Sequence, residues 1–180
     1  MAIKKFLALL RGINVGGKNV IKMDSLIKAF EEMQCTNVTT CIQSGNILFC
    51  SAKTGKIALA QSIKKNLAKK FNIETRALIL NHNDLEKIIT GAPAGFGEEP
   101  ETYRYDIWFL LPPLTADEVI RNTDIKEGVD AIYRGKSAVY TTRLICQMGK
   151  SRLIRTNQMP MYQNITIRNW NTGKKLLDLM

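Results

Sequence analysis

The sequence has little of the material from which most metal and catalytic sites are built. Its 180 residues include a single histidine, His82, and four cysteines, none of them in a C-x-x-C pair. Zinc sites take three or four Cys, His or carboxylate ligands in characteristic spacings. The G-x-S-x-G and H-E-x-x-H motifs of common hydrolases are also missing. We therefore predict no metal site, no cofactor and no catalytic residues, and favour a binding protein while leaving enzymatic activity open.

Long apolar runs and a disulfide framework are missing as well. The first apolar stretch, residues 6–10, stops at Arg11. A signal peptide needs an apolar core of about 7–15 residues, and a membrane-spanning helix needs about 20. The four cysteines suit free thiols in a reducing compartment better than disulfides. We expect a cytoplasmic protein that does not contact membranes.

Positive charge, by contrast, is in excess. The chain contains 26 Lys and Arg against 16 Asp and Glu, a net charge of +10. Residues 1–90 hold 14 basic and 6 acidic side chains, residues 132–180 hold 9 and 1, and residues 91–131 hold 3 and 9. Such a surplus favours anionic partners. Two interpretations stay open: the segments neutralise one another in the fold, or the two basic segments share a face.

The first half of the chain predicts the element order β-α-β-β-α-β. Its predicted elements are strands at 5–10, 38–43, 47–50 and 74–80, a helix beginning near Asp24, and an amphipathic helix at 56–71. This order with short connections is that of a ferredoxin-like unit. The unbroken apolar run of the first strand predicts a central strand buried on both faces. We expect the end of this strand and the tight turn at 44–46 to lie at opposite ends of neighbouring strands.

The second half predicts a smaller α+β subdomain with a helix at its C-terminal end. Its predicted elements are strands at 105–111, 129–133 and 138–142, and helices beginning at Thr115, Ser151 and Thr166. Each of these helices has a hydroxyl at the N-cap position, where it can accept a hydrogen bond from the first turn. Residues 91–101, rich in Gly, Pro and Glu, predict a boundary. We therefore predict an α+β protein with domains at 1–90 and 91–180.

The strongest local motif is RGINVGGKN at residues 11–19. Residues 12–18 satisfy the phosphate-loop pattern G-x-x-x-x-G-K between a predicted strand and a predicted helix. However, Asn19 stands where a Ser or Thr would hold Mg²⁺, and the helix begins near Asp24. The loop is either a turn whose glycines need positive φ or a cradle whose main-chain amides, with Arg11 and Lys18, accept an anion. We predict an anion-accepting loop without nucleotide hydrolysis.

Three segments together resemble one known family. They are RGINVGGKN at 11–19 followed by Met23, IQSGN at 42–46, and T-x-RNWNT at 166–172. The set resembles the bacterial domain of unknown function 1697 family, and the resemblance spans nearly the whole chain. It implies an α+β fold that begins with a ferredoxin-like unit. It implies no established activity.

We predict a binding module for an anionic ligand, either nucleic acid or a phosphorylated molecule. A sequence-specific RNA reader of the same element order is disfavoured, because residues 45–50 supply only Phe49 for base stacking. An enzyme acting on a phosphorylated metabolite and a protein–protein adaptor using the acidic segment 91–131 remain alternatives. The candidate anion-binding residues are the cations, glycines, amides and hydroxyl of three segments: Arg11, Asn14, Gly16, Gly17, Lys18, Lys150, Ser151, Arg152, Arg168 and Asn169.

Overall fold

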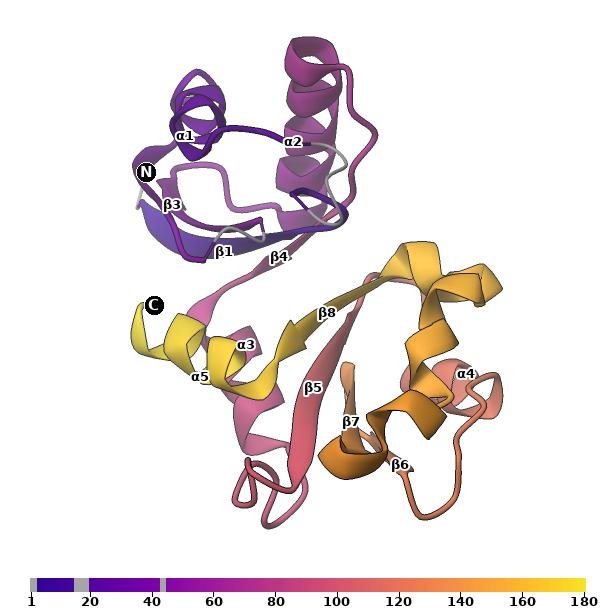
Figure 1. The fold of residues 1–180 in the computed structure, drawn as a ribbon. Coiled ribbons are helices and arrows are strands. Elements are labelled where there is room, and N and C mark those ends of the chain that lie inside the picture. The colour runs from indigo at the N-terminus through magenta and orange to yellow at the C-terminus, as the bar shows by residue number, and fades with distance from the viewer. Residues whose placement is uncertain (1–2, 15–19, 43–44) are drawn as a thin grey trace. The chain divides into compact units, whose positions relative to one another are not determined.

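The computed structural model of the chain describes residues 3–14, 20–42 and 45–180. Its contacts divide it into two compact units, Met1–Leu85 with Leu179–Met180, and Glu86–Asp178. Each unit combines a four-stranded antiparallel sheet with helices (Figure 1). The α+β class predicted from the sequence is therefore confirmed, although the two units are of similar length rather than a large and a small one. Within the described ranges, no helix has the length and apolar character needed to cross a membrane.

The first unit has its most apolar strand in the middle of the sheet. Its elements are β1 (Lys4–Leu10), α1 (Met23–Glu31), β2 (Thr36–Thr40), β3 (Asn46–Ser51), α2 (Lys56–Phe71), β4 (Ala77–Leu80) and the start of α3 (His82–Thr90). The strand order is β2-β3-β1-β4, with antiparallel pairing throughout. Residues 6–10 of β1 are all buried, so side chains on both faces of this strand are covered. The predicted central position of the first strand is confirmed.

Helices α1 and α2 cover one face of this sheet (Figure 1). The helix predicted at 56–71 has these bounds in the structure, and its apolar side chains Leu59, Ile63 and Leu67 are buried. They pack with Phe30 of α1 and with Phe49 of β3 in one hydrophobic core. Amphipathic spacing therefore positions both helices, as burial of an apolar stripe requires.

The end of β1 and the turn before β3 lie side by side, so the prediction that they are at opposite ends is wrong. Leu9 is the register partner of Asn46, and the Leu10 amide donates a 2.8 Å hydrogen bond to the Gly45 carbonyl. The reason is that β3 runs antiparallel to its neighbour β1, which brings its first residue beside the last residue of β1. Gly45 has φ +71°, and a Cβ there would lie 3.1 Å from the Leu10 Cβ. Glycine thus permits the close approach.

The second unit repeats the strand arrangement of the first. Its elements are the remainder of α3, β5 (Tyr103–Leu110), α4 (Ala116–Arg121), β6 (Asp130–Arg134), β7 (Ala138–Leu144), the 3₁₀ helices η1 (Ile145–Lys150), η2 (Leu153–Gln158) and η3 (Pro160–Asn164), then β8 (Ile165–Asn169) and α5 (Trp170–Asp178). The strand order is β6-β7-β5-β8, again antiparallel. Replacing each strand number n of the first sheet by n+4 gives the second.

The prediction of a helix beginning at Thr166 is wrong, because residues 165–169 form the edge strand β8. This strand pairs with β5 in the register Ile107↔Arg168 and Phe109↔Thr166. The run Ile-Thr-Ile carries β-branched side chains, which suit a pleated, half-buried surface. Helix α5 begins only at Trp170.

The prediction of a helix beginning at Ser151 is also wrong, since the chain there forms only the 3₁₀ helix η2. Its N-cap is Arg152, with no side-chain cap. By contrast, the cap predicted at Thr115 is confirmed, since its hydroxyl accepts a hydrogen bond from the Glu118 amide at the start of α4. A cap therefore predicts a helix only where the following residues also supply an apolar stripe.

Tyr140 of β7 should make the folded state less stable at high pH. It is 1% exposed, its hydroxyl donates to the Ile88 carbonyl, and burial raises its pKa to about 12. Between pH 10 and 12 the folded state keeps a proton that the unfolded state releases. The contribution of Tyr140 is therefore complete below pH 10 and falls by about 1.4 kcal/mol per pH unit above it. Urea unfolding at pH 9, 10 and 11 should show the wild-type advantage over Tyr140→Phe shrinking. An advantage that stays constant would contradict this.

Candidate anion-binding site

Three charged side chains of the second unit gather on one face of its sheet. Arg104 and Asp106 are two residues apart on β5, so their side chains share a face. Arg143 on β7 is the register partner of Arg104, which places two guanidinium-bearing residues directly opposite each other. Like charges in such cross-strand pairs repel. Asp106 lies beside both and offsets this repulsion.

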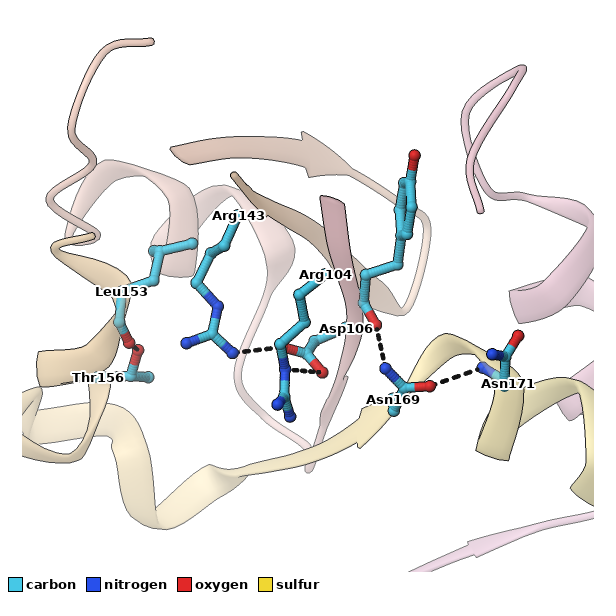
Figure 2. Close-up of polar contacts among 8 residues, drawn as sticks. Arg104, Asp106, Arg143, Leu153, Thr156, Asn169 and Asn171 are labelled. Atoms are coloured by element: carbon cyan, nitrogen blue, oxygen red, sulfur yellow. Dashed lines mark hydrogen bonds and ion pairs between the residues drawn. The ribbon is translucent and has the colours of Figure 1, made fainter. Parts of the chain in front are cut away.

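Asp106 holds both arginines through charge-assisted hydrogen bonds, and Figure 2 shows the two guanidinium groups converging on its carboxylate. Arg143 Nη2 donates to Asp106 Oδ2 at 2.7 Å. Arg104 Nε lies 3.0 Å from Oδ2 and 3.3 Å from Oδ1. The Asp106 side chain is 3% exposed, that of Arg143 16% and that of Arg104 50%. Hydrogen bonds between ionised groups are roughly twice as strong as neutral ones, so this carboxylate fixes the orientation of both arginines.

The same face is hollowed into a cavity of about 300 Å³. The three charged residues line it together with the polar side chains of Thr141, Thr156, Asn157 and Tyr162. The Thr156 hydroxyl donates a hydrogen bond to the main-chain carbonyl of Leu153 within η2 (Figure 2). The 3₁₀ segments thus supply a wall of the cavity, and the sheet supplies its charged floor.

The charged residues that line this cavity leave it electropositive. Two guanidinium groups face one carboxylate, and the described contacts use a single nitrogen of each guanidinium. A further carboxylate, Asp130, stands opposite Arg143 on β6. Its Oδ2 accepts the main-chain N–H groups of Lys126 and Arg152 at 2.9 and 2.8 Å, which already stabilise that charge. An arginine presents its N–H donors in a planar fork that matches phosphate or carboxylate oxygens.

Among the predicted residues of the first unit, Gly16, Gly17 and Lys18 lie outside the described residues. Asn14 has φ +54°, and its side chain closes the base of the loop. Its Nδ2 donates to the Ile21 carbonyl at 3.1 Å, and its Oδ1 accepts from the Ile21 amide at 2.7 Å. The described contacts of Asn14 are therefore structural.

Arg11 lies where two of the singled-out motifs meet. Its amide donates to the Arg76 carbonyl at 2.9 Å, and its carbonyl accepts the Thr75 hydroxyl at 2.8 Å. The neighbouring Leu10 bonds to Gly45, so the loop after β1, the turn before β3 and the start of β4 share one end of the sheet. The structure thus brings together the segments 11–14 and 45–46, which were predicted to lie at opposite ends of neighbouring strands.

The predicted residues 150–152 do not converge on one point. Lys150 is exposed, with its Nζ 3.3 Å from the Gln147 side-chain oxygen. Ser151 is 3% exposed, and its hydroxyl has no hydrogen-bond partner among the described residues. Arg152 pairs at 2.7 Å with Asp124 on the surface. The buried hydroxyl of Ser151 is not presented at a helix start.

The last two predicted residues have structural contacts on and beside β8. Arg168 pairs in register with Ile107 and so points to the face opposite Asp106. Its Nη1 donates to the Thr166 hydroxyl and to the Ile167 carbonyl, and burial lowers the pKa of its guanidinium to about 10. Asn169 donates to the Tyr105 carbonyl at 3.0 Å and accepts from the Asn171 amide at 3.1 Å (Figure 2). Asn169 is therefore a helix cap for α5.

Sequence reasoning did not select Arg104, Asp106 and Arg143. The available signal is the alternation Arg-x-Asp within a strand, which places both side chains on one face of the sheet. The opposing arginine comes from another strand 37 residues away, and only the register supplies it.

Metal-ligating residues do not cluster in the part of the chain that the structure describes. No three His, Cys, Asp or Glu side chains there are placed to hold an ion together. The single histidine, His82, is exposed at the first turn of α3.

Two comparisons place the chain among known proteins. It is similar over 99% of both chains to the structure of the conserved bacterial protein SP0830 from Streptococcus pneumoniae, with 27% sequence identity and a TM-score of 0.85. No curated protein matches it. The family described as protein of unknown function (DUF1697) matches residues 3–140. A match over this share of the sequence shows that the chain belongs to the DUF1697 family.

Proposed function

We propose that this protein binds a small phosphorylated molecule in the cavity of the second unit, with Arg104 and Arg143 on the phosphate. The observation that carries the proposal is the pair of guanidinium groups fixed on the buried Asp106 carboxylate, with further N–H donors that the contacts among described residues do not use, at a cavity of about 300 Å³. Because one carboxylate orients both arginines in advance, little side-chain entropy is lost when an anion binds. The basic surplus of the chain supports the same ligand charge.

A phosphoryl group suits this cavity better than a nucleic-acid backbone. The cavity is local, and beside the two arginines its lining includes the hydroxyl of Thr141 and the amide of Asn157, which can donate to the oxygens of one anionic group. A backbone-binding surface requires a row of cations on an open face, and its affinity falls steeply with salt. The two ligand classes therefore differ in their response to ionic strength.

The loop motif at residues 11–19 is a second proposed anion contact, in the first unit. Arg11 at the end of β1 is its described cation, and the loop starts where two other chain segments meet. We also propose that the first unit is ferredoxin-like, a class supported by its β-α-β-β-α-β order and the strand order β2-β3-β1-β4.

Phosphate titration of arginine variants tests the proposal. Isothermal titration of the wild type with inorganic phosphate should show binding that weakens about tenfold in Arg143→Gln and in Arg104→Gln, the effect of one charge-assisted hydrogen bond. Arg134→Gln is the matched control, because Arg134 is 63% exposed, pairs with Asp117 and lies outside the cavity lining. It should leave the affinity unchanged.

Two further titrations separate the alternatives. Arg11→Gln should remove only the weaker contribution of the loop and leave phosphate binding at the cavity intact, whereas a complete loss of binding would place the phosphate at the loop alone. A short single-stranded oligonucleotide should bind no tighter than phosphate and show a shallow salt dependence. Equal phosphate affinity in wild type and Arg143→Gln, or a steep loss of oligonucleotide affinity with salt, would overturn the cavity as a phosphate site.

A further inference from the structure

A second cavity of the second unit opens on the opposite face of the same sheet. It measures about 490 Å³, within the range of roughly 300–1,000 Å³ typical of small-molecule sites. Tyr105 and Thr142 contribute to its lining from β5 and β7. Because Tyr105 and Asp106 are consecutive on β5, their side chains point to opposite faces. This cavity is therefore separate from the arginine site, and a ligand can occupy it whether or not an anion binds there.

Aromatic rings in different orientations line this cavity. Phe96 meets Tyr105 at 74° with 4.8 Å between ring centroids, and meets Tyr133 at 85° and 6.4 Å. Tyr103 meets Tyr105 at 65° and 6.2 Å. All four of these residues belong to the lining. Rings set at steep angles to one another present π-faces and edges in several directions, as in the aromatic cages that hold quaternary ammonium groups.

The ionisable lining of this cavity is acidic, although the protein as a whole carries +10. Glu98 and Glu99 lie on its rim, and both are exposed. Of the described residues that line it, none is Lys or Arg. The hydroxyl of Tyr105 accepts from the Glu99 amide at 3.4 Å, which ties the acidic loop to the aromatic wall. The third acidic lining residue, Asp130, uses its Oδ2 on main-chain amides.

From this combination we infer that the cavity binds a small organic cation with a methylated ammonium group. The aromatic rings attract the cation through their quadrupoles, and the apolar methyl groups lose water against the same rings. The rim carboxylates favour a positive charge and disfavour anions. The volume suits a free small molecule, with the ammonium among the rings.

Choline and its neutral isostere 3,3-dimethyl-1-butanol test the inference on the full-length protein. The two differ in charge but hardly in shape. In calorimetric or NMR titration choline should bind at least about fivefold more tightly, since each cation–π contact contributes modestly at partly exposed sites. Equal affinity of the two, or no binding of choline, would overturn the inference.

Variants locate the ligand. Tyr133→Leu should weaken choline binding about threefold or more without unfolding the protein, because Tyr133 is 39% exposed. Glu98→Gln combined with Glu99→Gln should also weaken it, while binding of the neutral isostere stays the same. Glu101→Gln is the matched control, an exposed carboxylate of the same loop that does not line the cavity. A loss of choline affinity in Glu101→Gln equal to that of the double variant would contradict this placement.

Discussion

Replacing Gly97 by alanine should destabilise the second unit more than the same replacement at Gly95 or Gly149. Gly97 has φ +95°, a conformation that side chains rarely adopt, and a Cβ there would lie 2.2 Å from Trp170 Nε1 and 2.4 Å from Trp170 Cδ1. The indole ring is held by a T-shaped contact with Phe96 at 5.1 Å, so it cannot move away freely. Backbone strain of about 1–3 kcal/mol and overpacking of about 1–3 kcal/mol add to a loss of roughly 2–6 kcal/mol.

Two neighbouring glycines separate the two causes. Gly95 lies in the same loop with φ +74°, but its added Cβ would meet nothing closer than 3.7 Å, so Gly95→Ala reports the backbone cost alone. A Cβ added at Gly149 would meet nothing within 4 Å, and the φ angle of Gly149 lies outside the left-handed region, so Gly149→Ala should be close to neutral. Denaturant unfolding followed by tryptophan fluorescence should rank the losses Gly97 > Gly95 > Gly149. A loss at Gly97 no greater than at Gly95 would show that Trp170 gives way.

The elements that sequence predicted best are those whose local pattern also decides their burial. The spacing of Ile63 and Leu67 gave the bounds of α2, and the apolar run at 6–10 gave a central strand. The wrong prediction of a helix beginning at Thr166 has another cause. Residues 165–169 carry helix and strand signals together, and pairing with β5, a contact between segments far apart in the chain, decides between them. Such non-local pairing overrides local propensity.

The candidate site shows the same division between local and distant information. The glycine-rich loop at 11–19 was predicted as a site because its motif lies in consecutive residues. The cluster around Asp106 forms only when β5 and β7 pair in a defined register, which a local motif does not indicate. Conversely, Asn14 and Asn169 look like ligand-binding amides in the sequence, yet both bond to nearby main-chain groups as caps and loop closures. Asn side chains readily serve both purposes, and single sequences do not distinguish them.

Removing the Asp106 carboxylate should cost far more stability than removing a surface carboxylate in a similar ion pair. In Asp106→Ala the largely buried Arg143 loses the only carboxylate that bonds to it in the described contacts, and it still faces Arg104 across the strand pair. Arg104 is half-exposed, so solvent stabilises it and most of the cost arises at Arg143. Breaking a buried pair from one side costs about 3–5 kcal/mol, and because Arg143 is partly exposed we expect a loss of about 3 kcal/mol.

Two comparisons make this expectation decisive. Asp124→Ala removes the partner of Arg152 from a pair whose side chains are 72% and 49% exposed, and should cost less than about 1 kcal/mol. Asp106→Leu combined with Arg143→Met replaces both charged side chains by apolar groups of similar size, so no unpaired guanidinium is buried at position 143, and most of the lost stability should return. Urea unfolding at neutral pH gives the free energy of unfolding of the wild type and of the three variants. If Asp106→Ala and Asp124→Ala lose the same free energy, the Asp106 carboxylate does not hold the two arginines, and the phosphate site has no preorganised basis. If Asp106→Leu combined with Arg143→Met recovers most of the free energy of unfolding that Asp106→Ala loses, apolar side chains serve the fold as well as the charged pair does. That result favours the role of the Asp106 carboxylate in orienting Arg104 and Arg143 for a ligand.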